Sequence, residues 1–286
     1  MAASPFGRFA MLRWGCFGLL ALSFSVLAQP TAAPVIKVAS LRLPAIEGRW
    51  VDERERIVQL LSELRADVIV VQDVEQHGNT PNPACWLGGK LKYTCDFISA
   101  DRPSQPLRRG SAVLSRLAAQ GDGITLLHGD ELPAIAGMQR LQLQRARLNI
   151  YAASMRPADG STIARGHQAA DLRSWMDATG EGLPSLVVGD FSAPTDELVR
   201  QLPGFQPSRK NPSAKRGSTR SDEGQEHGMD VLYQVRSFAD IKQQAVELPP
   251  AGDEAGSLPL GMMATLRISR MVELPNGNAG NTGDSH

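Results

Sequence analysis

The most constraining feature of the sequence is a short apolar run, residues 186–190, that ends in Asp190 and is broken four residues later by Pro194. Such a run is typical of a buried strand in an α/β sheet, which delivers its last side chain to the edge of the sheet. Residues 68–73 repeat the pattern and end in Asp73. Folds of this kind keep their chemistry at strand ends, so the two carboxylates suggest a hard-cation site for phosphate chemistry.

Composition fits one large domain. The chain has 286 residues, of which 42% are hydrophobic and 21% are charged, with 30 basic and 30 acidic side chains. This apolar content can bury a substantial core. A formal net charge of zero provides no global field that would draw the chain onto nucleic acid or anionic lipid.

The first 28 residues have the pattern of a secretory signal. Arg8 and Arg13 precede the apolar residues 16–28, which end in Val-Leu-Ala, and cleavage there makes Gln29 the new N-terminus. An uncleaved membrane anchor is the alternative, although the run is shorter than the ~20 residues that a spanning helix needs. Cleavage leaves 28 basic and 30 acidic residues, a net charge of −2, and no transmembrane segment. We therefore expect a secreted or periplasmic protein.

Cysteine usage is consistent with export. Cys16 leaves with the signal, so Cys85 and Cys95 remain as an even pair. In an oxidising compartment such a pair favours a disulfide, which would stabilise the fold by ~2–3 kcal/mol in the entropic model. Two unpaired thiols are the alternative, and a zinc site lacks a ligand set.

Hydrophobic spacing divides the rest of the chain into strands and helices. Asp52 and Glu55 form a capping box before a helix with apolar residues at helical spacing, and residues 79–92 are expected to be loop. A second helix is predicted near residues 166–179 and a short one at 196–202. Strands are expected at residues 36–40, 68–72, 96–100, 111–115, 124–128, 186–190, 229–235 and 261–270, with two more in 141–154. Many short strands with helices set apart predict an α+β fold with helices outside the sheets.

Seven segments, in this order, resemble motifs of the endonuclease/exonuclease/phosphatase superfamily, which has the deoxyribonuclease-I-like fold. Each is unspecific alone, but together they cover nearly the whole chain after the signal. They are residues 36–40, 66–74, 110–116, 165–168, 189–192, 229–233 and 257–266. The resemblance implies a four-layer α/β/β/α sandwich over residues 29–275. The Gly, Asn and Ser content of residues 276–286 predicts a disordered tail.

The resemblance also implies hydrolysis of a phosphoester that depends on Mg²⁺ or Mn²⁺. In such a site a carboxylate holds the metal, an acid or a His–Asp pair activates water, and amides hold the phosphoryl oxygens. The family's metal-binding glutamate falls on Asp73, and its Asp-x-Asn pair falls on Asp190 and Ser192. Asp230 falls in the motif at residues 229–233.

Other positions depart from the family pattern. The asparagine expected after the first strand falls near Arg42, and a histidine falls on Ser154. The closing Asp-His pair falls on Leu258 and Pro259, neither of which can accept a proton. The loss of a general base alone costs about 10²–10⁴-fold in rate. These substitutions predict a catalytically degenerate member, a pseudoenzyme that binds or scaffolds.

The alternative is an active phosphodiesterase or nuclease with a rebuilt site. Asp73 would then bind the metal, and Asp190, Ser192, Asp230 and His227 would be the catalytic candidates. Each also has a structural reading, because acids at strand ends and a histidine in a loop are common without function. A basic cluster could grip a phosphate-containing ligand or an acidic protein partner, although a solvated loop is the simpler reading; it comprises Arg209, Lys210, Lys215 and Arg216.

Overall fold

A computed structural model describes residues 33–44, 49–78, 80–129, 134–155, 161–191, 193–209, 228–252 and 256–269. The predicted signal and the predicted tail lie outside these ranges. Within the described ranges, no helix has both the length and the apolar character needed to cross a bilayer.

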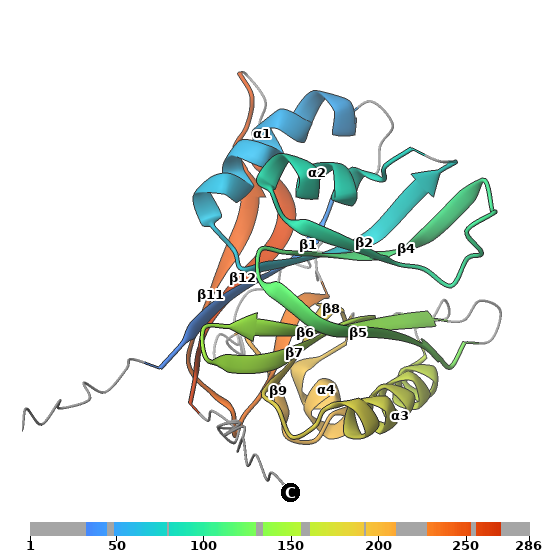
Figure 1. Ribbon diagram of the computed structural model, residues 1–286, viewed down its shortest axis with the longest axis vertical. Coiled ribbons are helices and arrows are strands. Elements are labelled where there is room, and N and C mark those ends of the chain that lie inside the picture. Colours follow the sequence, from blue (N-terminus) through green and yellow to red (C-terminus); the bar gives the residue numbers. More distant parts are fainter. Residues whose placement is uncertain are drawn as a thin grey trace, which may run out of the picture. The chain divides into compact units, whose positions relative to one another are not determined.

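Two six-stranded sheets form the centre of the structure (Figure 1). The first sheet has the order β11-β12-β1-β2-β4-β3 and the second the order β5-β6-β7-β8-β10-β9. The first consists of β1 (Val35–Arg42), β2 (Val68–His77), β3 (Thr94–Ile98), β4 (Leu107–Ser115), β11 (Phe238–Leu248) and β12 (Leu258–Ile268). The second consists of β5 (Ala118–Leu127), β6 (Ala134–Leu143), β7 (Ala146–Ser154), β8 (Ser185–Asp190), β9 (Phe205–Pro207) and β10 (Met229–Gln234).

Each sheet contains one parallel pair among antiparallel neighbours. β1 pairs with β2 and β7 pairs with β8 in parallel register, and a helix connects the strands of each pair. Parallel strands require such a crossover connection. As a result β1 and β2 end on the same edge of the first sheet, and β7 and β8 end on the same edge of the second.

The helices cover the outer faces of the sheets, so the predicted four-layer α/β/β/α sandwich is confirmed (Figure 1). The first sheet carries α1 (Arg49–Leu64) and α2 (Pro83–Leu91), and the second carries α3 (Thr162–Thr179) and α4 (Thr195–Gln201).

Three apolar clusters hold these layers together. The inner cluster takes one face of each sheet and includes Val70 and Val188. The outer face of the first sheet packs against α1 through Leu61, and that of the second packs against α3 and α4 through Leu172 and Leu198. β2 and β8 are therefore buried on both faces, which explains their continuous apolar runs.

Two sequence expectations were wrong. α1 already includes Arg49, so Asp52 lies in its first turn and does not cap it. Residues 83–91 are helical and not loop. Asn82 caps α2 by accepting a hydrogen bond from the backbone N–H of Cys85 at 2.8 Å, and Pro83 lies in the first turn, where proline is tolerated. The predicted Cys85–Cys95 disulfide is formed and joins α2 to β3.

Candidate functional site

The candidate site lies where strand ends from both sheets meet. Arg42 is the last residue of β1, and Asp190 is the last residue of β8. Parallel pairing places Arg42 beside Gln72, directly before Asp73 in β2, and places Asp190 beside Ser154 of β7. Two acids that are far apart in sequence are thus brought to one place.

Arg42 bridges the two acids. Its Nη2 atom donates a hydrogen bond to Oδ2 of Asp190 at 2.7 Å and lies 2.6 Å from Oδ2 of Asp73. The side chain of Asp190 is only 4% exposed, whereas those of Arg42 and Asp73 are 40% and 55% exposed. A guanidinium stays protonated in proteins, so a permanent positive charge lies between the two carboxylates.

The backbone of β2 directs Asp73 toward this arginine. The pairing of β2 with β4 shifts register between Val71 and Val74, and Asp73 has a positive φ of 53°. A bulge of this kind redirects a side chain, and aspartate is among the few residues that tolerate the left-handed region. Asp73 thus lies within β2, at the bulge, and its side chain reaches Arg42 at the end of β1.

The floor of the site is polar and tightly packed. The hydroxyl of Ser40 donates a hydrogen bond to the carbonyl oxygen of Gly189 at 3.0 Å, which links the two sheets directly below Asp190. A Cβ atom on Gly189 would lie 1.6 Å from the carbonyl oxygen of Ala153. Only glycine permits this close approach, so the position of Asp190 is fixed by the strand that carries it.

Asp230 is completely buried and is held by several groups. Its Oδ1 accepts hydrogen bonds from the backbone N–H and the hydroxyl of Ser208, at 3.1 and 2.9 Å, and from the N–H of Val231 at 2.7 Å. Its Oδ2 lies 3.2 Å from Nε of Arg209. Burial raises the pKa of the Asp230 carboxyl, and the charge of Arg209 and these hydrogen bonds oppose that shift.

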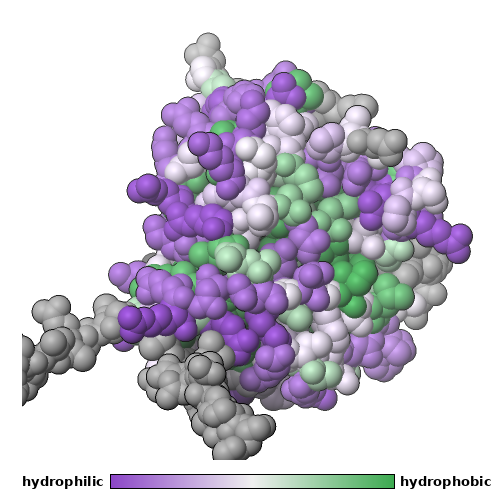
Figure 2. Space-filling model, in the orientation of Figure 1, coloured by the Kyte–Doolittle hydropathy of each residue, from purple (hydrophilic) through white to green (hydrophobic). Residues whose placement is uncertain are grey.

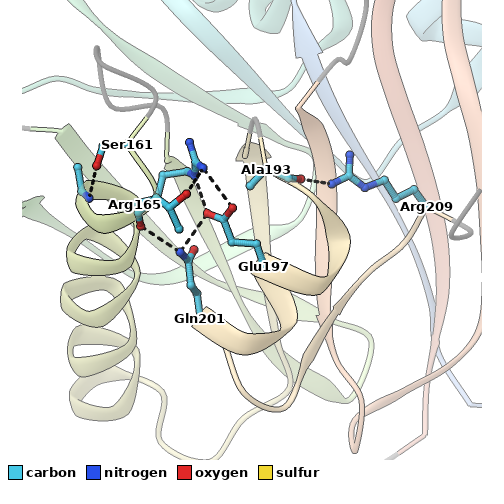
Figure 3. Close-up of polar contacts among 8 residues, drawn as sticks. Ser161, Arg165, Ala193, Glu197, Gln201 and Arg209 are labelled. Atoms are coloured by element: carbon cyan, nitrogen blue, oxygen red, sulfur yellow. Dashed lines mark hydrogen bonds and ion pairs between the residues drawn. The ribbon is translucent and has the colours of Figure 1, made fainter. Parts of the chain in front are cut away.

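Arg209 faces the protein interior. Besides its contact with Asp230, its Nη2 donates a hydrogen bond to the carbonyl oxygen of Ala193 at 2.7 Å (Figure 3). It therefore ties β10 to the segment that connects β8 with α4, directly after Asp190. Its predicted partners in a basic cluster, Lys210, Lys215 and Arg216, lie outside the described residues, as do Ser192 and His227.

A second buried ion pair supports the same segment from the other side. Arg165 in α3 forms a two-pronged pair with Glu197 in α4, with N–O distances of 2.7 and 3.1 Å, and Gln201 donates a hydrogen bond to Glu197 at 3.1 Å (Figure 3). Both charged side chains are more than nine-tenths buried. The pair fixes α4, which begins soon after Asp190. The sequence motif at residues 165–168 predicted a helix opening here but not this partner.

The donor set at the strand ends does not suit a divalent metal. Mg²⁺ prefers oxygen ligands in octahedral geometry, and the two acids that could supply them share a guanidinium. Asp230 is occupied by its own neighbours. Among the described residues, no group of three or more histidine, cysteine, aspartate or glutamate side chains is arranged to hold a metal ion.

The chain was compared with known proteins. A sequence model described as "Endonuclease/Exonuclease/phosphatase family" matches residues 44–231, more than half of the chain. A search of curated protein sequences gives no match.

Solved structures share the fold. An endonuclease/exonuclease/phosphatase family protein from Leptotrichia buccalis C-1013-b has a TM-score of 0.60 at 12% identity, covering 83% of this chain and 100% of that one. The human Nocturnin catalytic domain with bound sulfate anion has a TM-score of 0.60 at 19% identity, with coverage of 82% and 94%. Truncated TDP2 from Caenorhabditis elegans has a TM-score of 0.59 at 11% identity, with coverage of 82% and 97%. At identities this low the likeness shows the fold alone.

Proposed function

Because the chain belongs to the endonuclease/exonuclease/phosphatase family, we propose that it is an exported, catalytically degenerate member whose ancestral active-site end serves binding or scaffolding. The observation that carries the proposal is the bridge from Arg42 to Asp73 and Asp190. The permanent charge of the guanidinium lies between the two carboxylates that a catalytic metal would need. A metal ion would have to displace it against direct charge repulsion.

The residues around the bridge add to this argument. Ser154 lies beside Asp190, in the position that the family resemblance gives to a histidine. Leu258 and Pro259 begin β12, in the positions that it gives to an Asp-His pair. None of these three side chains is a general base near neutral pH. A loss of that base costs about 10²–10⁴-fold in rate, and the metal's contribution would be lost in addition.

The proposed ligand is a phosphate-containing molecule or a protein partner. Arg42 keeps 40% of its side chain exposed, so the bridge still presents a guanidinium at the surface. A guanidinium fork recognises phosphate and carboxylate oxygens equally well in geometric terms. Two carboxylates against one guanidinium give the cluster a net negative charge, so the donor groups of a protein partner fit it better than a phosphate does.

A second candidate function is an active phosphodiesterase with a rebuilt site. It is favoured by one observation, the closeness of Asp73 and Asp190 to the same nitrogen atom. If Arg42 turned outward into solvent, the two carboxylates could approach a metal, with His227 as a base.

Hydrolysis assays separate these functions. The purified protein is incubated with plasmid DNA and with bis-p-nitrophenyl phosphate in the presence of Mg²⁺ or Mn²⁺, beside Asp190→Ala and a control variant, Asp196→Ala. Asp196 is an exposed acid paired with Arg200 on α4 and takes no part in the site. We expect no turnover above buffer from any of the three. Hydrolysis of either substrate by wild type and Asp196→Ala, but not by Asp190→Ala, would contradict the pseudoenzyme proposal.

Export is tested separately. We expect the protein recovered from its host to begin at Gln29, and its Cys85 and Cys95 to resist alkylation until a reductant is added. N-terminal sequencing and mass spectrometry measure both. A mature chain that retains residues 1–28 would contradict export by a cleaved signal.

A further inference from the structure

Sheet edges carry unpaired backbone groups, and proteins usually protect them. Of the four edge strands within the described residues, three are protected. β3 has five residues, and β9 has three and ends in Pro207. β11 has two register shifts and carries charges such as Lys242 and Glu247. These are the usual devices against pairing with another chain.

The fourth edge strand, β5, lacks these devices over most of its length. Its pairing with β6 shifts register between Ala119 and Gly121 and is regular over residues 121–127. That stretch contains neither proline nor a basic residue, and Asp122 is its one charge. Among the described residues, no backbone hydrogen bond joins the outer edge of residues 121–127 to another segment.

This strand also exposes two large apolar side chains. Ile124 is 62% exposed and Leu126 is 58% exposed. A Cβ on Gly123 would face Trp175 of α3, so the alternate residues Ile124 and Leu126 point away from that helix. Figure 2 shows strongly apolar atoms on the face in view, to the right of centre, near where β5 passes in Figure 1.

Neighbouring packing explains why these side chains stay uncovered. Ile98 at the end of β3 lies over Gly137 of β6, where an added Cβ would approach its Cδ1 atom to 2.1 Å. Gly137 is the partner of Ile124 in the β5–β6 ladder. β3, an edge strand of the first sheet, thus covers β6 of the second sheet. Ile124 lies on β5, one strand beyond β6, where β3 does not cover it. The edge and its apolar face are exposed together.

We propose that a second copy of this chain pairs with β5 in antiparallel orientation, about a two-fold axis at Thr125. In this register Ile124 lies opposite the partner's Leu126, and Asp122 lies opposite the partner's His128. Both apolar residues gain a cross-strand apolar neighbour. The acid meets a histidine whose Nδ1 atom already lies 3.0 Å from Asp171 of α3, so only the Nε2 atom of that ring is left for it. In a two-fold interface each contact occurs twice, because the same strand of both copies forms the interface.

Other two-fold registers of the same strand fit less well. An axis at Ile124 would place Asp122 opposite the partner's Leu126, which sets an acid against an exposed apolar side chain. An axis at Leu126 would place Ile124 opposite the partner's His128 and leave Asp122 beyond the end of the partner's strand. Only the axis at Thr125 matches apolar with apolar and acid with histidine. This self-match favours a second copy over an unrelated extended peptide.

A cysteine at the axis tests the register directly. In Thr125→Cys the two introduced thiols lie on residues directly opposite each other, where antiparallel strands hold Cα atoms about 4.5–5.5 Å apart. We expect mild oxidation to convert this variant into a covalent dimer on non-reducing gels. Ile163→Cys is the control, because Ile163 is 74% exposed on α3 and far from the proposed axis in sequence. Wild type gives the background from Cys16, if that residue is retained.

Association without a cross-link is measured by light scattering and sedimentation over a micromolar concentration series. We expect a concentration-dependent dimer for wild type and for Ile163→Lys, and at least a ~10-fold weaker dimer for Ile124→Lys, equal to about 1.4 kcal/mol. Circular dichroism checks that each variant folds. Three results would each overturn the proposal: a wild type that stays monomeric throughout, equal cross-linking at positions 125 and 163, or β5 pairing only with peptides of other proteins.

Discussion

Arg42→Gln is the sharpest perturbation of the strand-end site, because it removes the shared charge and keeps much of the side chain's volume. The Oδ2 atoms of Asp73 and Asp190 both contact Nη2 of Arg42, so they can be no farther apart than the two distances of 2.6 and 2.7 Å combined. Without the guanidinium, two carboxylates face each other across about 5 Å, which costs up to ~3 kcal/mol at an effective dielectric constant of about 20.

The expected loss of stability follows from the exposure of each partner. The Asp73 side chain is 55% exposed, so its pair with Arg42 contributes at most ~1 kcal/mol. The Asp190 side chain is 4% exposed, and removing the partner of a buried charge costs ~3–5 kcal/mol. Arg42 is itself 40% exposed, so water can enter and reduce the penalty. We expect Arg42→Gln to lower the free energy of unfolding by about 2–3 kcal/mol without metal.

The same variant should gain an affinity for divalent cations that wild type lacks. With the guanidinium gone, a metal ion is the natural partner for the two acids. At a concentration ten times its Kd, the metal would raise the free energy of unfolding by ~1.4 kcal/mol. For a domain of this size that corresponds to an increase in Tm of about 3–5 °C. Thermal unfolding with increasing Mg²⁺, Mn²⁺ or Ca²⁺ measures this shift.

Two controls decide whether the reasoning holds. Arg42→Gln combined with Asp190→Asn should lose the metal response. Arg200→Gln, which breaks an exposed pair with Asp196, should leave stability within ~0.5 kcal/mol of wild type. If divalent metals stabilise wild type as much as Arg42→Gln, and the response needs Asp190, then Arg42 does not block the site.

Three further predictions concern the buried groups around the site. Burial raises the pKa of Asp230, so the folded state holds that proton more tightly than the unfolded chain, and wild type loses stability as pH rises above the ordinary value of ~3.9. Asp230→Asn should not show this pH-dependent loss, and urea unfolding of both proteins between acid and neutral pH measures it. A difference in unfolding free energy between wild type and Asp230→Asn that stays constant with pH would contradict the prediction. Arg165→Met should destabilise by ~3–5 kcal/mol because it leaves Glu197 buried without its partner, whereas Arg165→Met with Glu197→Leu should recover most of the loss in the same assay. Gly189→Ala should prevent stable folding, because its Cβ would meet a backbone oxygen of β7 at 1.6 Å, whereas Gly121→Ala, with no atom within 4 Å, should fold normally; comparable melting curves would show that β7 and β8 can separate.

The sequence predicted the elements whose pattern reflects burial. The apolar runs of β2 and β8 are buried on both faces, and α1 shows helical spacing because one face packs on the first sheet. β11 was missed because it is an edge strand whose centre is polar and exposed, as at Lys242, Gln243 and Gln244. α2 was missed because it contains Pro83, Gly88 and Gly89, which usually indicate loop. Its capping residue, its disulfide and its packing against the sheet outweigh that poor local preference.

The candidate site was only partly predictable for a related reason. Strand-end patterns identified Asp73 and Asp190, and the family resemblance identified Arg42 as an unexpected cation. The bridge itself depends on how two sheets meet, as in the contact from Ser40 to Gly189, and on the bulge that turns Asp73. No local pattern in one strand encodes the distance to a strand of the other sheet. The buried partners of Arg165 and Asp230 were missed for the same reason.

The retained acids can be explained without retained catalysis. A carboxylate at the end of a buried strand, such as Asp190, is costly unless a cation lies beside it. In a metal-dependent enzyme a bound ion supplies that charge, so the stability of the site depends on metal supply. Here Arg42 supplies it from within the chain, and Asp73 completes the pair on the exposed side. Once the arginine is present, losing Asp190 would leave the guanidinium without its buried acceptor, whereas losing Asp73 would leave a neutral pair of Arg42 and Asp190. Selection for a stable fold then suffices to keep Asp190, and the presence of the two carboxylates alone does not indicate hydrolysis.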